Sequence, residues 1–308
     1  MMCVNQAQYL ACLPVLGQRH HVILDWLPWN HTFAGNSTFN MVLANGMSLY
    51  LDDGKPIPGR FERTLENARQ VPITLSFDVP VAHGMKVAAM KEDAELRRAY
   101  FGDLDIFFYA GASLPADIWS AVEDMAMQER GDIPLMTSSW GMTETAPMTV
   151  IMYEKGGRSG NVGVPAPEVV VKLLPIGPNR YELRCQGPNV FTGYLDDPQK
   201  TAASIDEDGF LITADAVGKV DPNDLSRGLF FDGRVSEDFK LVTGTWVQAS
   251  MMRLALLPRL KGLAQDVVIC GEGQSEIGLL IFAAPGRGQD GTGVVEDATL
   301  ANEIRAVL

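Results

Sequence analysis

One feature restricts the possible folds of this chain most: a short apolar run followed by a loop rich in hydroxyl side chains. The run at 133–136 predicts a buried strand, and the loop at 137–147 reads Thr-Ser-Ser-Trp-Gly-Met-Thr-Glu-Thr-Ala-Pro. Hydroxyls can meet phosphate oxygens, glycine admits a close ligand, and Glu144 is a hard oxygen ligand suited to Mg²⁺. An ordinary turn capped by Thr143 or Thr145 explains the loop equally well, so the loop alone does not decide between the two.

The five residues at 140–144, Trp-Gly-Met-Thr-Glu, are similar to a signature of the adenylate-forming enzymes. That family comprises acyl- and aryl-CoA synthetases, luciferases and the adenylation domains of peptide synthetases. Its aromatic ring stacks on adenine, its threonine contacts phosphate and its glutamate holds Mg²⁺. The resemblance therefore implies that Trp140 binds adenine, and that Thr143 and Glu144 are catalytic, with Glu144 as the metal ligand.

Composition and charge exclude several other classes of protein. The chain has 308 residues, of which 46% are apolar and 20% charged, as in a globular protein of about two domains. A net charge of -13 and a pI near 4.7 argue against a general nucleic-acid binder, which needs a basic face. No apolar run is long enough to span a bilayer, and no signal peptide is evident. We expect a cytoplasmic protein without a membrane span.

The cysteines and histidines show no spacing typical of a metal site. There is no Cys-x-x-Cys pair and no histidine at zinc spacing. We expect free thiols in a reducing compartment. The residues concerned are Cys3, Cys12, Cys185, Cys270, His20, His21, His31 and His83.

A second informative segment, at 22–36, is an apolar run followed by an aromatic turn that contains proline. It looks like a strand that delivers side chains to a cleft at its carboxyl end. A lone histidine among aromatics is more often a core residue than a functional one. The string at 27–31, however, resembles the family's Leu-Pro-x-x-His segment, and together with 50–56 it looks most like feruloyl-CoA synthetases. The resemblance implies a catalytic role for His31 and an acyl cleft lined by Trp29, His31 and Gly141.

The first half of the chain alternates strand-like and helix-like segments. Such alternation implies an α/β fold, with a mostly parallel sheet and helices on both of its faces. The expected helices are 1–19, 61–68, 85–100 and 117–128, and the expected strands are 22–24, 48–51, 71–80 and 104–109.

Gly111 and Ala112 directly follow the strand expected at 104–109. Small residues at the end of a core strand let the backbone approach a flat ligand, although such a turn is unremarkable by itself. The segment is similar to the family's Gly-Ala-x-x-Leu turn. The resemblance implies that Gly111 and Ala112 wall the adenine.

After Pro147 the sequence changes to short strands broken by glycine and proline. This texture predicts a small β-barrel or distorted sheet packed on the α/β part. The pattern Glu-Leu-x-x-x-Gly-Pro-x-Val-x-x-Gly-Tyr at 182–194 resembles another family signature, which we interpret as structural rather than catalytic. Two later β-prone runs, at 266–271 and 276–282, predict the start of a smaller α+β domain.

Three charged residues of the later chain carry further expectations. Asp215 ends an apolar run, where a carboxylate can accept hydrogen bonds from ribose, although a turn or cap is its more ordinary role. The family has Thr-Gly-Asp at this place, with Ala214 here replacing the glycine. The resemblance implies that Asp215 binds the ribose and that Arg234 binds the ribose or a phosphate. The alternative for the charged turn that carries Arg234 is a solvated hairpin. Lys240 matches the lysine that the family uses for thioester formation.

We predict three parts: an α/β part of the large AMP-binding domain at 1–147, a β-rich subdomain at 148–232, and a hinge with an incomplete small domain at 233–308. No phosphate loop rich in Gly, Ser and Thr with a lysine occurs, although the family places one before the segment corresponding to 1–20. Lys261 is the last lysine, so the late adenylation lysine is also missing. The chain looks like the middle and later part of a longer enzyme.

The resemblance implies ATP-dependent activation of an aryl, ferulate-like carboxylic acid. The acid attacks the α-phosphorus to give an acyl-adenylate and pyrophosphate, and coenzyme A then forms the thioester. The expected partners are therefore the aryl acid, ATP, Mg²⁺ and coenzyme A, and the protein contributes positioning and charge stabilisation. Two alternatives stay open: the same chemistry on a fatty or another aromatic acid, and a non-catalytic nucleotide-binding remnant. We expect the isolated chain to be weakly active or inactive.

Overall fold

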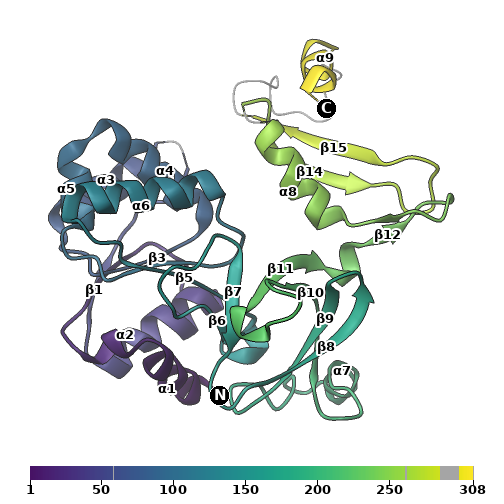
Figure 1. The fold of residues 1–308 in the computed structure, drawn as a ribbon, viewed down its shortest axis with the longest axis horizontal. Helices are drawn as coiled ribbons and strands as arrows, with labels where there is room; N and C mark the ends of the chain where they lie inside the picture. Colours follow the sequence, from purple (N-terminus) through teal and green to yellow (C-terminus); the bar gives the residue numbers. More distant parts are fainter. Residues whose placement is uncertain (58, 261, 285–297, 308) are drawn as a thin grey trace. The chain divides into compact units, whose positions relative to one another are not determined.

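The computed structural model describes residues 1–57, 59–260, 262–284 and 298–307 (Figure 1). The fold is α/β, with a central sheet and flanking helices, as predicted. The chain divides into two compact units. The first unit comprises Met1–Asn179, Leu183–Thr213 and Gly218–Phe231, and the second comprises Arg180–Glu182, Ala214–Val217 and Asp232–Leu308. The three-part division at 147 and 232 stays a prediction.

Five strands form the parallel part of the sheet, in the order β2-β1-β3-β4-β5. Every residue of β3 and β4 is buried, which explains why β4 reads as a continuous apolar run rather than as an alternating one. The strands are β1 (Val22–Asp25), β2 (Ser48–Leu51), β3 (Leu75–Asp78), β4 (Ile106–Tyr109) and β5 (Leu135–Gly141). The strand predicted at 71–80 is thus shorter than expected.

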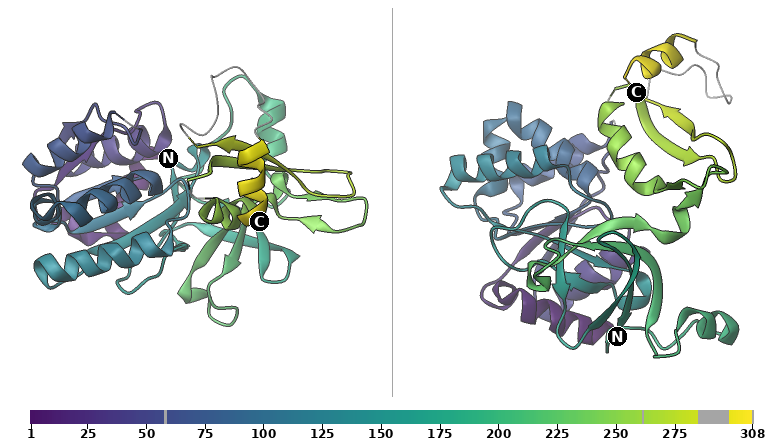
Figure 2. Two further views of the ribbon diagram at one scale, coloured as in Figure 1. Left: turned by 90° about the horizontal axis from the view of Figure 1, so that it is seen from above. Right: turned by 45° about the vertical axis from the view of Figure 1, so that its right-hand side comes forward.

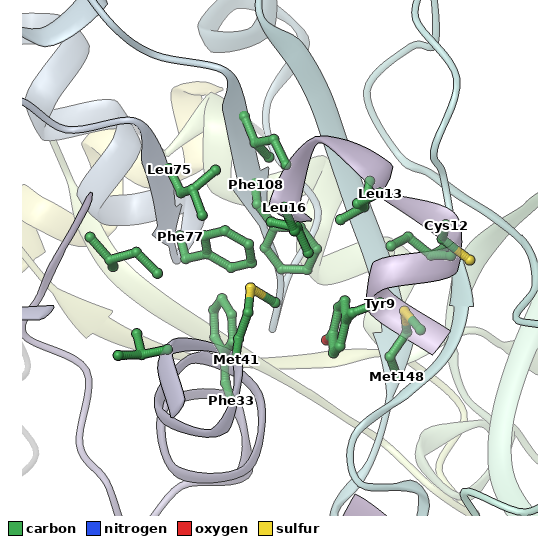
Figure 3. Packing of buried hydrophobic residues seen from close by; sticks show 14 of the residues in the cluster. Tyr9, Cys12, Leu13, Leu16, Phe33, Met41, Leu75, Phe77, Phe108 and Met148 are labelled. Atoms are coloured by element: carbon green, nitrogen blue, oxygen red, sulfur yellow. The ribbon is translucent and has the colours of Figure 1, made fainter. Parts of the chain in front are cut away.

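Helices cover both faces of this parallel part, and alternate residues of its strands point to the two cores. Ile106 and Phe108 join the cluster that contains Tyr9 of α1 (Met2–Cys12), shown in Figure 3. Phe107 and Tyr109 join the opposite cluster. Figures 1 and 2 show the two layers. The remaining helices are α2 (Asn40–Asn45) on the side of α1, and α3 (Phe61–Gln70), α4 (Pro80–Glu92), α5 (Ala94–Phe101) and α6 (Ala116–Arg130) on the other.

Three local structures differ from the sequence prediction. The helix predicted at 85–100 is two helices, because the Asp93 side chain accepts a hydrogen bond from the Leu96 backbone N–H at 2.9 Å and caps a new start. The expected helix at 1–19 ends at Cys12 and is followed by a short 3₁₀ turn, η1 (Pro14–Gly17). A π-helical segment, η2 (Phe33–Phe39), was not predicted.

The β-rich stretch is confirmed as strands, but they continue the strand order of the parallel part as β5-β6-β7-β11-β10-β9-β8. The pairs β5-β6, β6-β7 and β7-β11 are antiparallel. They therefore extend the central sheet through hydrogen-bonded pairs, whereas the sequence predicts a small β-barrel or distorted sheet packed on the α/β part. The elements are η3 (Thr143–Thr145), β6 (Met148–Ile151), β7 (Asn161–Pro165), β8 (Val170–Gly177), β9 (Arg180–Gln186), α7 (Pro198–Ser204), β10 (Leu211–Lys219), η4 (Leu225–Arg227) and β11 (Leu229–Arg234).

The second unit has its own small core and an α+β composition, as predicted. Both predicted late strands are present, as β14 (Ala264–Cys270) paired with β15 (Gly278–Ala283). Residues 285–297, where the sequence is rich in glycine, lie outside the described part of the chain. The other elements are η5 (Val235–Glu237), β12 (Phe239–Lys240), β13 (Trp246–Val247), the unpredicted α8 (Ala249–Arg259), and α9 (Ala298–Val307). No helix of the described chain is long and apolar enough to cross a membrane.

Candidate active site

The carboxyl ends of β4 and β5 bring two of the predicted adenine-binding segments to one edge of the sheet. The strands are parallel, with Tyr109 opposite Ser138. Gly111 follows β4 in an exposed turn and has φ of +85°, a left-handed conformation that favours glycine. Trp140 lies near the end of β5. Since ligands of open α/β sheets bind beyond the carboxyl ends of strands, this edge is the candidate site.

The loop after β5 is tighter than its sequence suggested, because β5 runs on to Gly141. A Cβ at position 141 would lie 1.7 Å from the Pro147 carbonyl oxygen, so the turn itself requires glycine. Thr145 is fully buried and its hydroxyl accepts a hydrogen bond from the Met142 N–H at 3.1 Å. The capping role therefore belongs to Thr145. Thr143 stays exposed, with its hydroxyl open to a ligand.

Glu144 is fixed by one hydrogen bond to its backbone and by one to its side chain. Its carbonyl oxygen accepts a hydrogen bond from the Phe191 N–H at 2.8 Å. Its carboxylate Oε1 accepts a hydrogen bond from the Tyr194 hydroxyl at 2.8 Å. Burial and this contact raise the pKa of Tyr194 to about 12. Tyr194 was missed in the sequence, where its Gly-Tyr motif was interpreted as structural only.

A single carboxylate fits the way in which Mg²⁺ is usually bound beside substrate phosphates. Among the described residues, Glu144 Oε2 has no hydrogen-bond partner, whereas Oε1 is occupied. The described part of the chain holds no group of three or more His, Cys, Asp or Glu side chains placed to bind a metal. A metal at Glu144 would therefore need the nucleotide or water for its remaining ligands.

The predicted adenine and acyl residues differ in exposure. Trp140 is only 6% exposed, so its ring is packed within the first unit. Trp29 is 49% exposed and His31 is exposed, as expected for residues that meet a substrate. The His31 Nδ1 accepts a hydrogen bond from the Phe33 N–H at 3.2 Å, which orients the ring. A Cβ at Gly35 would lie 2.3 Å from the Trp29 carbonyl oxygen, so a close backbone approach holds this turn.

The remaining predicted residues belong to the second unit. The Arg234 Nε lies 3.3 Å from Asp215 Oδ1, and their side chains are 56% and 8% exposed. Ala214 has φ of +57°, so the alanine adopts the left-handed conformation for which glycine would be better suited. Lys240 is exposed, and its Nζ lies 5.9 Å from the centre of the Trp246 ring. The structure thus brings Asp215 and Arg234 together, and it places Lys240 on β12.

A surface cavity of about 330 Å³ in the first unit does not contain any of the predicted site residues. It lies beside the β6–β7 connection. Its charged lining mixes both signs, and we assign it no role in the candidate site. The lining includes Tyr153, Lys155, Arg158, Asp221 and Arg227.

Buried carboxylates lie at the carboxyl ends of β1 and β3. Asp25 is 4% exposed; its Oδ1 accepts a hydrogen bond from the Leu27 N–H at 2.9 Å, and its Oδ2 has no partner among the described residues. Asp78 is paired with the buried Lys86 at 2.8 Å. Burial raises the pKa of Asp25 to about 6. Repulsion from Asp78 and Asp52 adds to this shift, and the positive charge of Lys86 opposes it.

Asp25→Asn is expected to stabilise the protein at pH 8 by up to about 3 kcal/mol. The raised pKa means that folded Asp25 keeps its proton up to about pH 6, whereas the unfolded carboxyl loses it near pH 4. The parent protein therefore loses stability as the pH rises through this window. The Asp25→Asn variant does not, because asparagine carries no charge and still accepts the hydrogen bond from the Leu27 N–H. Urea unfolding at pH 4 to 8 measures the difference in unfolding free energy between the variant and the parent, which should fall toward zero at pH 4. Asp53→Asn, at a side chain 84% exposed, is the control and should change little.

The chain is similar to known proteins in sequence and in fold. Residues 2–195 match the family described as AMP-binding enzyme. Human long-chain-fatty-acid–CoA ligase 1 is 35% identical over 115 residues, which cover 35% of this chain and 16% of that protein. Probable 4-coumarate–CoA ligase 1 of Dictyostelium discoideum is 25% identical over 269 residues, which cover 85% of this chain and 45% of that protein. The chain spans less than half the length of these two relatives.

Two solved structures resemble the chain along almost its whole length. An anthranilate CoA ligase in complex with anthranoyl-AMP has a TM-score of 0.73 at 15% identity, covering 99% of this chain and 56% of that one, and so shares the fold. A malonyl-CoA ligase with methylmalonyl-CoA and AMP bound has a TM-score of 0.60 at 26% identity, covering 98% and 63%. Since the family match spans more than half of the residues, the chain belongs to the AMP-binding enzyme family.

Proposed function

We propose that the protein is an AMP-forming acid–thiol ligase, which activates a carboxylic acid with ATP and then transfers the acyl group to coenzyme A. The observation that carries the proposal is the Glu144 loop, within the segment that matches the family, at the carboxyl edge of parallel strands. It leaves an exposed hydroxyl, from Thr143, and one carboxylate oxygen, Glu144 Oε2, available to a ligand. With Mg²⁺ on the carboxylate, such a loop would suit the phosphates of a nucleotide better than an uncharged ligand.

The roles assigned to the residues follow from the two steps of the reaction and from the negative charge on the phosphates. A carboxylate oxygen of the acid attacks the α-phosphorus, pyrophosphate leaves, and the thiol sulfur then displaces AMP from the acyl carbon. Thr143 would donate to phosphate, Glu144 would hold Mg²⁺, and Trp140 with Gly111 and Ala112 would bind adenine. Mg²⁺ would supply neutralisation of phosphate charge. Asp215 accepts hydrogen bonds from the ribose, and Arg234 donates to ribose or phosphate.

We propose an aryl, ferulate-like acid as the substrate. Support comes from the exposed Trp29 beside His31 and from the length of the match to a probable 4-coumarate–CoA ligase, which covers 85% of this chain. A fatty acid is the second candidate, because the long-chain-fatty-acid–CoA ligase is more similar residue by residue, at 35% identity over its shorter match. In either case Trp29, His31 and Gly141 would line the acyl cleft.

Acid-dependent exchange of labelled pyrophosphate into ATP tests both proposals on the complete gene product. The panel consists of ferulate, 4-coumarate, palmitate and malonate, each with ATP and Mg²⁺. We expect exchange with the two aryl acids. Exchange with palmitate alone would overturn the aryl assignment and keep the ligase chemistry. Nucleotide binding without exchange for any acid would support the non-catalytic remnant instead.

Lys240→Ala is expected to slow thioester formation by roughly 10–100-fold and to spare adenylation, if Lys240 donates a charge-assisted hydrogen bond in that step only. The two half-reactions are measured separately, as pyrophosphate exchange and as release of AMP from preformed acyl-adenylate by coenzyme A. Lys91→Ala, at an exposed lysine of α4, is the matched control. A parallel fall of both half-reactions would assign Lys240 to stability rather than to the thioester step.

A further inference from the structure

The segment from Gly187 to Tyr194 touches the Glu144 loop at three places, all within the first unit. The fully buried Asn189 donates its side-chain amide to the carbonyl oxygens of Thr145 at 3.1 Å and Met148 at 2.9 Å. The Phe191 N–H donates to the Glu144 carbonyl oxygen. These contacts fix the backbone of the loop on both sides of Glu144.

Among the residues that the structure describes, Tyr194 alone hydrogen-bonds the Glu144 side chain, through the bond of 2.8 Å from its hydroxyl to Oε1. The ring that carries this hydroxyl is itself held in place. The Phe191 ring packs edge-on against it with 4.8 Å between centroids, and Lys200 Nζ lies 4.1 Å from its centre. The Tyr194 N–H also donates to the Thr201 hydroxyl at 2.9 Å. A hydroxyl fixed in this way fixes the carboxylate that accepts from it.

We propose that Tyr194 is a positioning residue, which holds Glu144 by Oε1 so that Oε2 is presented to the cation that accompanies a nucleoside triphosphate. The inference rests on the proposed function, because it takes Glu144 as the metal ligand. It changes our interpretation of the Gly-Tyr motif, which then acts on the nucleotide site and not on the fold alone.

A tyrosine suits this task for an electrostatic reason. A lysine or arginine in its place would also hold the carboxylate, but its positive charge would compete with the cation for the same group. The tyrosine hydroxyl is neutral near pH 7 and donates the hydrogen bond of 2.8 Å to Oε1. It therefore orients Glu144 without neutralising it.

Tyr194→Phe tests the proposal, because it removes the hydroxyl and keeps the ring that Phe191 and Lys200 contact. Calorimetry on the complete gene product measures ATP affinity with Mg²⁺ and in EDTA, and urea unfolding in EDTA measures stability. We expect the gain in affinity that Mg²⁺ brings to fall by roughly 10-fold in the variant. Affinity in EDTA and the unfolding midpoint should stay near those of the parent. Tyr153→Phe, at a tyrosine 41% exposed, is the control.

A double-mutant cycle with Glu144→Gln separates positioning from other roles. If Tyr194 acts through Glu144, its removal should have almost no effect on the Mg²⁺-dependent gain once glutamine stands at 144. Additive effects, or equal losses with Mg²⁺ and in EDTA, would overturn the proposal and make Tyr194 structural. The binding measurement is decisive even if no acid supports pyrophosphate exchange, so failure of the ligase proposal remains distinguishable.

Discussion

Glu144→Gln in the complete gene product is expected to lower Mg²⁺-dependent acyl-adenylate formation by roughly 10²–10³-fold. Glutamine has nearly the same shape, and its amide oxygen can still accept the hydrogen bond from Tyr194. The backbone contact with Phe191 is also kept. The variant therefore removes a negative charge and little else, so the fold should survive. Pyrophosphate exchange measured across a range of Mg²⁺ concentrations follows the effect.

Glu154→Gln supplies the matched control, since Glu154 is an exposed glutamate of the β6–β7 connection. It should leave the Mg²⁺ dependence unchanged. If Glu144→Gln behaves like this control, with the same rate and the same Mg²⁺ requirement as the parent, the metal assignment is wrong. We also expect the unfolding midpoint of Glu144→Gln to match that of the parent. This matters because an unfolded variant would show lower exchange without any effect on the metal.

Asp215→Ala is expected to weaken ATP binding by roughly 10²–10⁴-fold, because two hydrogen bonds from ribose hydroxyls to a carboxylate contribute about 1.5–3 kcal/mol each. Affinity for the carboxylic acid should change far less. The Asp215 side chain is 8% exposed and lies 3.3 Å from Arg234, so its removal also frees the arginine. Asp215→Asn keeps the volume and one acceptor and should show a smaller loss. Calorimetry with ATP and with the acid compares the two ligands.

The contrary result for Asp215 is an equal loss of affinity for ATP and for the acid. That outcome would assign Asp215 to the structure of β10 and its ion pair with Arg234. Urea unfolding of the alanine and asparagine variants adds a separate measure of that structural role. A ribose-binding role predicts that the change in ATP affinity exceeds the change in unfolding free energy.

The α/β architecture could be predicted because buried parallel strands leave a strong signal. Ile106, Phe107, Phe108 and Tyr109 are apolar or aromatic at every position, since alternate residues of β4 face two different cores. The helix break at Asp93 was hidden for a local reason. Its capping hydrogen bond to Leu96 interrupts a run whose helical spacing continues on both sides, so periodicity alone joins α4 and α5.

The details of the candidate site were less predictable, because they depend on contacts between distant residues. Nothing local marks the tyrosine at 194 as the partner of a glutamate fifty positions earlier. The glycine at 141 was expected to admit a ligand, whereas the structure shows that it also admits Pro147 of its own turn. The motif order of the family indicated which segments matter, but side-chain pairing needed the fold.

Transfer of oxygen-18 from the carboxylic acid to AMP tests the central claim most directly. The complete gene product is incubated with the acid labelled in both carboxyl oxygens, ATP, Mg²⁺ and coenzyme A, and the products are weighed by mass spectrometry. Attack on the α-phosphorus followed by thiolysis at the acyl carbon leaves one acid oxygen on phosphorus, so the account predicts AMP with a single oxygen-18. ADP with labelled orthophosphate, or unlabelled AMP beside the acyl-CoA product, would contradict it.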